Sequence, residues 1–229
     1  MEYPHNRPYT ADDLVRIITL LRDPVNGCPW DKVQTHTSIR MNFLEEAYEA
    51  VDALDLDDPV LMCEELGDVL MQVAFHTCME QETGRFTWEQ VCDGVCQKLI
   101  ERHPNIFGTQ PGYEGITDWD ALKNKEKGRR TLADDLESVP RAMPALMRAA
   151  KLQKRAARHG AALQGADVVA LADAAENLQT AQPASAQAEQ AVGELLFAAA
   201  NLARQAGVDP EQALQKANEA FCTAAGPVA

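Results

Sequence analysis

Residues 38–81 read SIRMNFLEEAYEAVDALDLDDPVLMCEELGDVLMQVAFHTCMEQ. Apolar residues recur at steps of three and four over residues 38–54, and again from residue 60 to about residue 81. This period is typical of amphipathic helices. Asp58-Pro59 places a turn and a new helix start between the two runs. Because the turn is short, the stretch predicts two antiparallel helices that lie side by side.

Further helices are expected on both sides of this hairpin. Thr10 precedes two aspartates and an apolar pattern, which predicts a capped helix that ends near Asp23-Pro24. The polar stretch 180–190 is interpreted as a loop between segments rich in alanine and poor in bulky core residues. No run of alternating β-branched residues stands out, so the predicted fold class is all-α. The other predicted helices cover residues 87–102, 118–127 and 144–157.

Composition and charge exclude several classes of protein. The chain has 229 residues, of which 46% are hydrophobic and 24% charged, with a formal net charge of −14. These fractions are typical of a folded globular protein, and the acidic excess argues against general nucleic-acid binding. No apolar run approaches the ~18 residues of a membrane span, and the first residues lack the features of a signal peptide. We therefore expect a cytoplasmic protein with neither nucleic-acid nor membrane partners.

The six cysteines lie apart in apolar patterns. A zinc site needs more ligands at closer spacing, so we expect buried, reduced thiols. They are Cys28, Cys63, Cys78, Cys92, Cys96 and Cys222.

The charges are segregated along the chain. Residues 41–84 contain twelve Asp or Glu and no Lys or Arg, whereas residues 121–160 contain eleven Lys or Arg and four acids. A solvated helix surface usually mixes both signs, because like charges at helical spacing repel each other. The acidic block therefore suggests bound cations.

Five carboxylates of the acidic block share helical faces. Glu45, Glu46 and Glu49 lie three or four residues apart on the first helix of the hairpin, and Glu65 and Asp68 lie three apart on the second. The hairpin brings the two sets together, and their apolar neighbours Phe43, Leu44, Val69 and Leu70 are expected to be buried. Protons or a metal ion must then neutralise the acids, and oxygen ligands suit Mg²⁺ or Mn²⁺.

A plain acidic surface is the alternative to a metal site. Gly67 favours the metal, because a glycine inside a helix costs about 1 kcal/mol unless a close approach requires it. On the next helix, Lys98 and Arg102 lie four residues apart on one face and are candidates to clamp a polyphosphate. Their alternative role is that of exposed cations at a helix end, where the helix dipole favours them.

Several of these segments together resemble the MazG nucleoside triphosphate pyrophosphohydrolases. The resemblance spans roughly residues 12 to 158. It rests on Leu21-Arg22-Asp23-Pro24, Gly27-Cys28-Pro29-Trp30-Asp31, Gln34-Thr35-His36, the two carboxylate motifs and residues 98–107.

The resemblance implies an all-α NTP pyrophosphatase fold, a homodimer, and Mg²⁺-dependent hydrolysis of a nucleoside triphosphate to a monophosphate and pyrophosphate, with Mn²⁺ as a possible substitute. By position, it makes Glu46, Glu49, Glu65 and Asp68 the metal ligands. Glu45 becomes the catalytic carboxylate that orients or deprotonates the attacking water, and Lys98 and Arg102 hold phosphate. Trp30 is expected either to stack on the nucleotide base or to be a buried anchor.

The resemblance also implies two repeats, of which the second is degenerate. Residues 1–108 form the first repeat, residues 109–143 a linker with a short helix, and residues 144–229 a truncated second repeat. Gly193-Glu194 echoes Gly67-Asp68, but Ala191 stands at the counterpart of Glu65. We therefore expect no metal site in residues 161–229 and catalysis in the first repeat.

Other functions remain open at this stage. One alternative is a nucleotide-binding regulatory module with weak or no turnover, which the degenerate second repeat favours. Others are a purely structural helical scaffold and a related all-α pyrophosphatase that acts on dUTP or a phosphoribosyl nucleotide.

Overall fold

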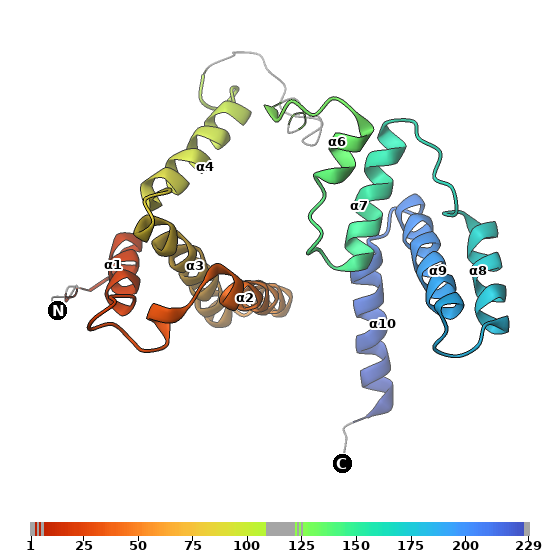
Figure 1. Cartoon of the computed structure of the whole chain (residues 1–229), viewed down its shortest axis with the longest axis horizontal. Helices are drawn as coiled ribbons and strands as arrows, with labels where there is room; N and C mark the ends of the chain where they lie inside the picture. Colours follow the sequence, from red (N-terminus) through yellow and green to blue (C-terminus); the bar gives the residue numbers. More distant parts are fainter. Residues whose placement is uncertain are drawn as a thin grey trace. The chain divides into compact units, whose positions relative to one another are not determined.

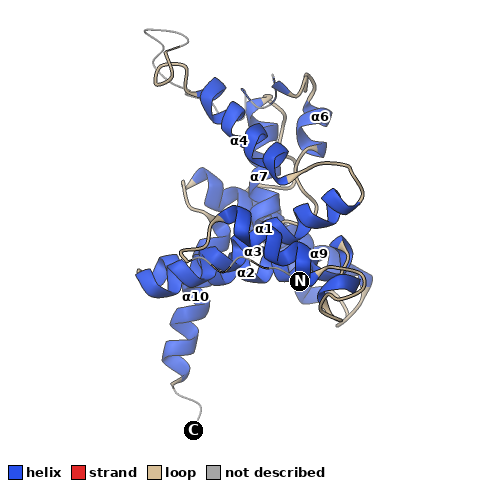
Figure 2. Ribbon diagram, turned by 90° about the vertical axis from the view of Figure 1, so that its left-hand side faces the viewer, coloured by secondary structure: helices blue, strands red, loops and turns tan. Residues whose placement is uncertain are grey.

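The computed structural model describes residues 7–108 and 126–226, together with Tyr3, His5, Leu122 and Asn124. The chain divides into two compact units, Met1–Ile116 and Thr117–Ala229 (Figure 1). All regular structure in the described ranges is helical, as predicted (Figure 2). The helix expected over residues 118–127 falls largely outside the described residues. Of the helices that are described, none combines the length and the apolar character needed to cross a membrane.

The helices of the first unit begin where short polar residues cap them. Thr10, Thr35 and Thr87 each accept a hydrogen bond from the backbone N–H three residues later, and Asp58 caps the helix that Pro59 opens. The predicted hairpin is confirmed, because a turn at Asp57-Asp58 joins two helices that pack against each other. The elements are α1 (Ala11–Leu21), the 3₁₀ turn η1 (Asp31–Val33), α2 (His36–Leu56), α3 (Pro59–Glu82) and α4 (Trp88–Arg102).

The core of the first unit lies at one end of the α2–α3 hairpin. α1 packs across α3, and the first turns of α4 complete the cluster. The buried residues are Ile18, Ile39, Ala74, Phe75, Cys78, Met79 and Trp88.

The opposite end of the hairpin is much less covered, and this corrects one expectation. Phe43, Leu44 and Val69 are only partly buried, and Leu70 is exposed. The physical reason is that two helices can hide only the faces they turn toward each other, while the residues packed into the core belong to the far end of α3.

The second unit contains α6 (Leu132–Glu137), α7 (Ala145–Arg158), α8 (Val168–Thr180), α9 (Ala186–Gln205) and α10 (Pro210–Ala225). The short α6 is absent from the sequence predictions, although Thr131 caps it. The loop between α8 and α9 spans residues 181–185, shorter than the predicted 180–190, because Ser185 caps α9 and good helix formers follow it.

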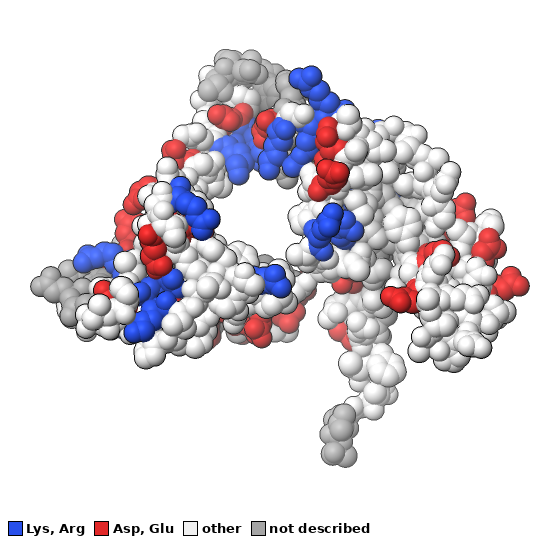
Figure 3. All heavy atoms as spheres, viewed as in Figure 1, with Lys and Arg blue, Asp and Glu red and all other residues white. Residues whose placement is uncertain are grey.

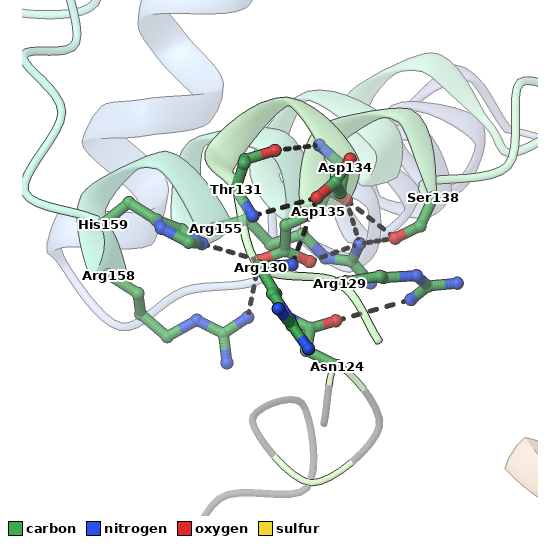
Figure 4. Close-up of polar contacts among 10 residues, drawn as sticks. All are labelled: Asn124, Arg129, Arg130, Thr131, Asp134, Asp135, Ser138, Arg155, Arg158 and His159. Atoms are coloured by element: carbon green, nitrogen blue, oxygen red, sulfur yellow. Dashed lines mark hydrogen bonds and ion pairs between the residues drawn. The ribbon is translucent and has the colours of Figure 1, made fainter. Parts of the chain in front are cut away.

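Small and polar side chains hold the second unit together. Buried alanines, among them Ala174 and Ala198, allow α8 and α9 to approach closely. Asp135 is buried, forms ion pairs with Arg155 and Arg158, and lies 3.2 Å from His159 Nε2, which joins α6 to the end of α7 (Figure 4). These contacts connect α6 to α7, whose own packing contacts involve few bulky side chains.

The cysteines are only partly as predicted. Cys78 is buried, and Cys28 and Cys92 are half-buried, but Cys63, Cys96 and Cys222 are exposed. All six are free thiols. The exposed ones lie on helix faces that no other described element covers.

Candidate active site

Three of the predicted carboxylates converge between α2 and α3. One carboxylate oxygen each of Glu46, Glu49 and Glu65 lies within 4.8 Å of the other two. Among the described residues, these three form the group of side chains that could hold a metal ion. Asp68 and Glu45 are not members of this group. Acidic side chains gather along α2 at the lower edge of the first unit in Figure 3.

The charges of Asp68 and Glu45 nevertheless act on this group, Asp68 on Glu46 and Glu65, and Glu45 on Glu46. Partial burial is the main cause that raises the pKa of Glu46, and the charges of Asp68, Glu49 and Glu45 raise it further, against a hydrogen bond from Gln72. The pKa of Glu65 is raised first by desolvation and then by Glu64, Asp68 and Glu46. The cluster therefore contains negative charges that the chain itself does not compensate.

The donor set fits a hard divalent cation. Carboxylate oxygens at close range are the ligands that Mg²⁺ and Mn²⁺ prefer, and no thiol or imidazole belongs to the group. Gly67 was explained above by a close approach of another group to the helix. This explanation is wrong for the described residues, because a Cβ added at Gly67 would meet no atom within 4 Å.

A polar row continues from the carboxylates along α3. Asp68, Gln72, His76 and Glu80 follow each other at intervals of four residues, so they lie on one face of the helix. Gln72 Nε2 donates to Glu46 Oε1 at 3.4 Å. Sequence reasoning missed the last three members, although the same spacing from Asp68 is the signal that reveals them.

The far end of this row fastens the start of α2. His36 Nδ1 lies 2.7 Å from His76 Nδ1, and His36 Nε2 lies 2.5 Å from Glu80 Oε1. Arg85 contacts the other oxygen of Glu80 at 2.7 Å. The two helices are therefore joined by polar contacts along their length, which gives the carboxylates a fixed frame.

Trp30 lies on the loop that precedes α2, and its side chain is 56% exposed. The buried-anchor alternative is therefore wrong for Trp30. Arg22 has that role instead: its Nη1 donates to the carbonyl oxygens of Asp31, at 2.7 Å, and Gln34, at 3.2 Å. Buried Arg22 thus holds the loop, while the indole of Trp30 remains accessible. Stacking of this indole on a nucleotide base stays a prediction.

The fold of the first unit does not bring the two predicted phosphate-binding cations to the carboxylates. Only the first turns of α4, with Trp88 and Cys92, pack against the core. α4 then runs away from α2 and α3 in both Figure 1 and Figure 2, and it carries Lys98 and Arg102 in its last turns. Lys98 is exposed and Arg102 half-buried.

The second unit repeats the helix packing of the first unit but not its group of converging carboxylates. α7 packs on α9 as α1 packs on α3, α8 pairs with α9 as α2 pairs with α3, and α10 contacts α9 as α4 contacts α3. Over residues 161–226, where the structure is described, no three carboxylates converge. Ala191, at the counterpart of Glu65, is buried.

Comparison with known proteins points to one family. The family model of the MazG nucleotide pyrophosphohydrolase domain matches residues 34–107, which include both helices of the hairpin and α4. An Escherichia coli K12 protein named nucleoside triphosphate pyrophosphohydrolase is 41% identical over 219 residues, covering 92% of this chain and 83% of the relative.

Two further relatives differ in how much of them is matched. The Thermotoga maritima protein named nucleoside triphosphate pyrophosphohydrolase/pyrophosphatase MazG is 39% identical over 212 residues, covering 92% of this chain and 82% of the relative. The Bacillus subtilis protein YabN is 38% identical over 213 residues, which are 90% of this chain but 43% of that protein. The chain therefore belongs to the MazG nucleotide pyrophosphohydrolase family.

Proposed function

We propose that this chain hydrolyses nucleoside triphosphates to nucleoside monophosphates and pyrophosphate, and that residues 1–108 carry the catalysis. The observation that carries the proposal is the convergence of Glu46, Glu49 and Glu65, with Asp68 close enough to raise the pKa of two of them. The names of the relatives from E. coli and T. maritima support the same reaction.

The cofactor that we propose is Mg²⁺, with Mn²⁺ as a substitute. Glu46, Glu49, Glu65 and Asp68 would hold it, and a bound cation supplies charge stabilisation at the phosphoryl group under attack. The support is the chemistry of the site: the pKa values of Glu46 and Glu65 are raised first by desolvation and then by neighbouring negative charges. Binding a divalent cation relieves that repulsion.

The protein side chains have separate tasks in this proposal. Glu45, exposed beside Glu46, orients the attacking water and accepts its proton. Trp30, accessible on its anchored loop, stacks on the base. Lys98 and Arg102 neutralise the phosphates.

We propose further that the active protein is a homodimer. Eight large hydrophobic side chains of α2 and α3 are exposed in the single chain, and a second copy that covers this hairpin would bury them. A second copy would also complete a pocket that the first unit leaves without its cations. The eight are Met41, Tyr48, Val51, Leu54, Leu56, Val60, Leu66 and Leu70.

Residues 109–143 are proposed as the linker and residues 144–229 as a degenerate second repeat with a stabilising role. The repeated packing pattern of α7 to α10 supports this division. Because the acidic excess disfavours nucleic acid and no described helix can span a membrane, we place the enzyme in the cytoplasm, acting on free nucleotides.

The test is product analysis with Mg²⁺ and a panel of ribo- and deoxyribonucleoside triphosphates. The wild type and the control D55N, which changes an exposed acid of α2 outside the cluster, should release monophosphate and pyrophosphate. E49Q and D68N should release neither while their helical circular dichroism is unchanged. Full activity of either variant would refute the site.

A second candidate function is that of a nucleotide-binding regulatory module. It is favoured by the course of α4, which carries the cations away from the carboxylates in the single chain. Mg²⁺-dependent nucleotide binding without products, in the same assay, would establish it.

A further inference from the structure

Gln72 is a buried amide of which only one of the two polar atoms forms a hydrogen bond. It is 7% exposed, and its Nε2 donates to Glu46 Oε1 at 3.4 Å. Its Oε1 is buried and has no hydrogen-bond partner. A buried acceptor without a donor costs about 1–3 kcal/mol, so a side chain that served only to pack α3 against α2 would be better apolar.

The surroundings of Gln72 indicate what the unpaired oxygen is for. Gln72 lies one helical turn beyond Asp68, on the face of α3 that carries the polar row, and in contact with one of the three converging carboxylates. His76 and Glu80, farther along the row, are both in contact with His36 of α2. Gln72 instead bonds to Glu46 of the carboxylate group.

We propose that Gln72 is a positioning residue of the cation site. Its Nε2 holds Glu46 in the orientation in which the carboxylate binds the cation, and its Oε1 accepts a hydrogen bond from a water in the hydration shell of that cation. The proposal rests on the proposed function, because it requires a cation at Glu46, Glu49 and Glu65.

A neutral amide suits this position for an electrostatic reason. It can donate to a carboxylate and accept from a water at the same time, whereas a glutamate would add one more negative charge to the cluster and would have no proton to donate to Glu46. Hydrogen bonds of this kind orient metal ligands, and their loss typically weakens metal affinity by about 10- to 100-fold.

The experiment is calorimetric titration of the full-length protein with Mn²⁺ alone, combined with urea denaturation of the metal-free protein. Q72M keeps the volume but removes both polar atoms. We expect Mn²⁺ to bind about 10- to 100-fold more weakly than to the wild type, while the metal-free variant is as stable or more stable. A purely structural role would give the opposite pattern, with stability lost and affinity unchanged.

The chain offers a matched control in Gln153 of the second unit. This amide is also buried, donates through Nε2 to the carbonyl oxygen of Phe197 at 2.7 Å, and has an unpaired Oε1, but it belongs to no carboxylate group. Q153M should leave Mn²⁺ affinity unchanged. Activity gives a further readout: turnover of Q72M at low Mg²⁺ should fall, and saturating Mg²⁺ should restore part of it.

The outcomes separate this inference from the proposed function. Wild-type Mn²⁺ binding that disappears in E49Q but persists unchanged in Q72M would overturn the role of Gln72 and leave the cation site intact. Absence of Mn²⁺ binding in the wild type would overturn both.

Discussion

Replacement of Arg22 by methionine tests how the loop with Trp30 is held. The Arg22 side chain is 6% exposed, and its Nη1 donates to the carbonyl oxygens of Asp31 and Gln34. Its Nε and Nη2 donate to the two oxygens of Glu82 at 2.5 and 2.8 Å. R22M keeps the apolar stem but removes all these donors.

The expected cost follows from the exposure of each partner. Two carbonyl oxygens lose a charged donor, at about 1.5–3 kcal/mol each, whereas the pair with Glu82 adds only about 1 kcal/mol or less. The pair contributes little because the Glu82 side chain is 45% exposed. R22M should therefore destabilise the first unit by about 3–7 kcal/mol, and E82Q by about 1 kcal/mol or less.

Hydrogen exchange followed by mass spectrometry is the appropriate assay, because two units can unfold separately and peptides of each are read independently. In R22M the amides of Gly27 and Cys28, which bond to the carbonyls of Asp23 and Leu21, should lose protection. Peptides of the second unit should be unchanged. A cost below about 1 kcal/mol with the loop still protected would refute Arg22 as the anchor.

Three further predictions concern stability. Burial and the charge of His36 lower the pKa of His76 from its ordinary value of 6.5. Between the lowered pKa and 6.5, His76 therefore binds fewer protons in the folded protein than in the unfolded chain. The free energy of unfolding should fall as the pH drops through that window. Urea midpoints across this range should show a smaller fall for H76Q, and an equal fall would refute the assignment. D135N leaves buried Arg155 with a weakened partner and should cost about 3–5 kcal/mol, read on second-unit peptides by hydrogen exchange. G27A places a Cβ against backbone atoms and should lower the melting temperature. In G67A the added Cβ meets no atom within 4 Å, so this substitution should stabilise the metal-free protein by about 1 kcal/mol.

Local signals in the sequence predicted most helix starts correctly. Thr10 and Asp58-Pro59 act through hydrogen bonds and backbone angles within three residues, so their effect needs no knowledge of the rest of the chain. The grouping of Glu46, Glu49 and Glu65 could also be predicted, because helical spacing and a short turn define which residues face each other. The short α6 escaped prediction because it is a single capped segment without a long apolar period.

Burial and long-range polar contacts could not be predicted in the same way. Leu70 has the periodicity of a core residue, but whether it is buried depends on what covers α3, and α1 covers the other end. The four-residue spacing from Asp68 puts Gln72 on the same face of α3, but only the folded chain shows Glu46 beside it. Lys98 has helical spacing from Arg102, but that spacing says nothing about the direction in which α4 leaves the core.

Periodicity, capping and turn length were enough to predict most of the helices, the hairpin and the carboxylate faces. The folded chain was needed to see that Arg22 rather than Trp30 is the buried anchor, that Gln72 donates to Glu46, and that α4 points away from the carboxylates. Capping and helical spacing act within a few residues, whereas burial and the pairing of polar atoms depend on segments that only folding brings together.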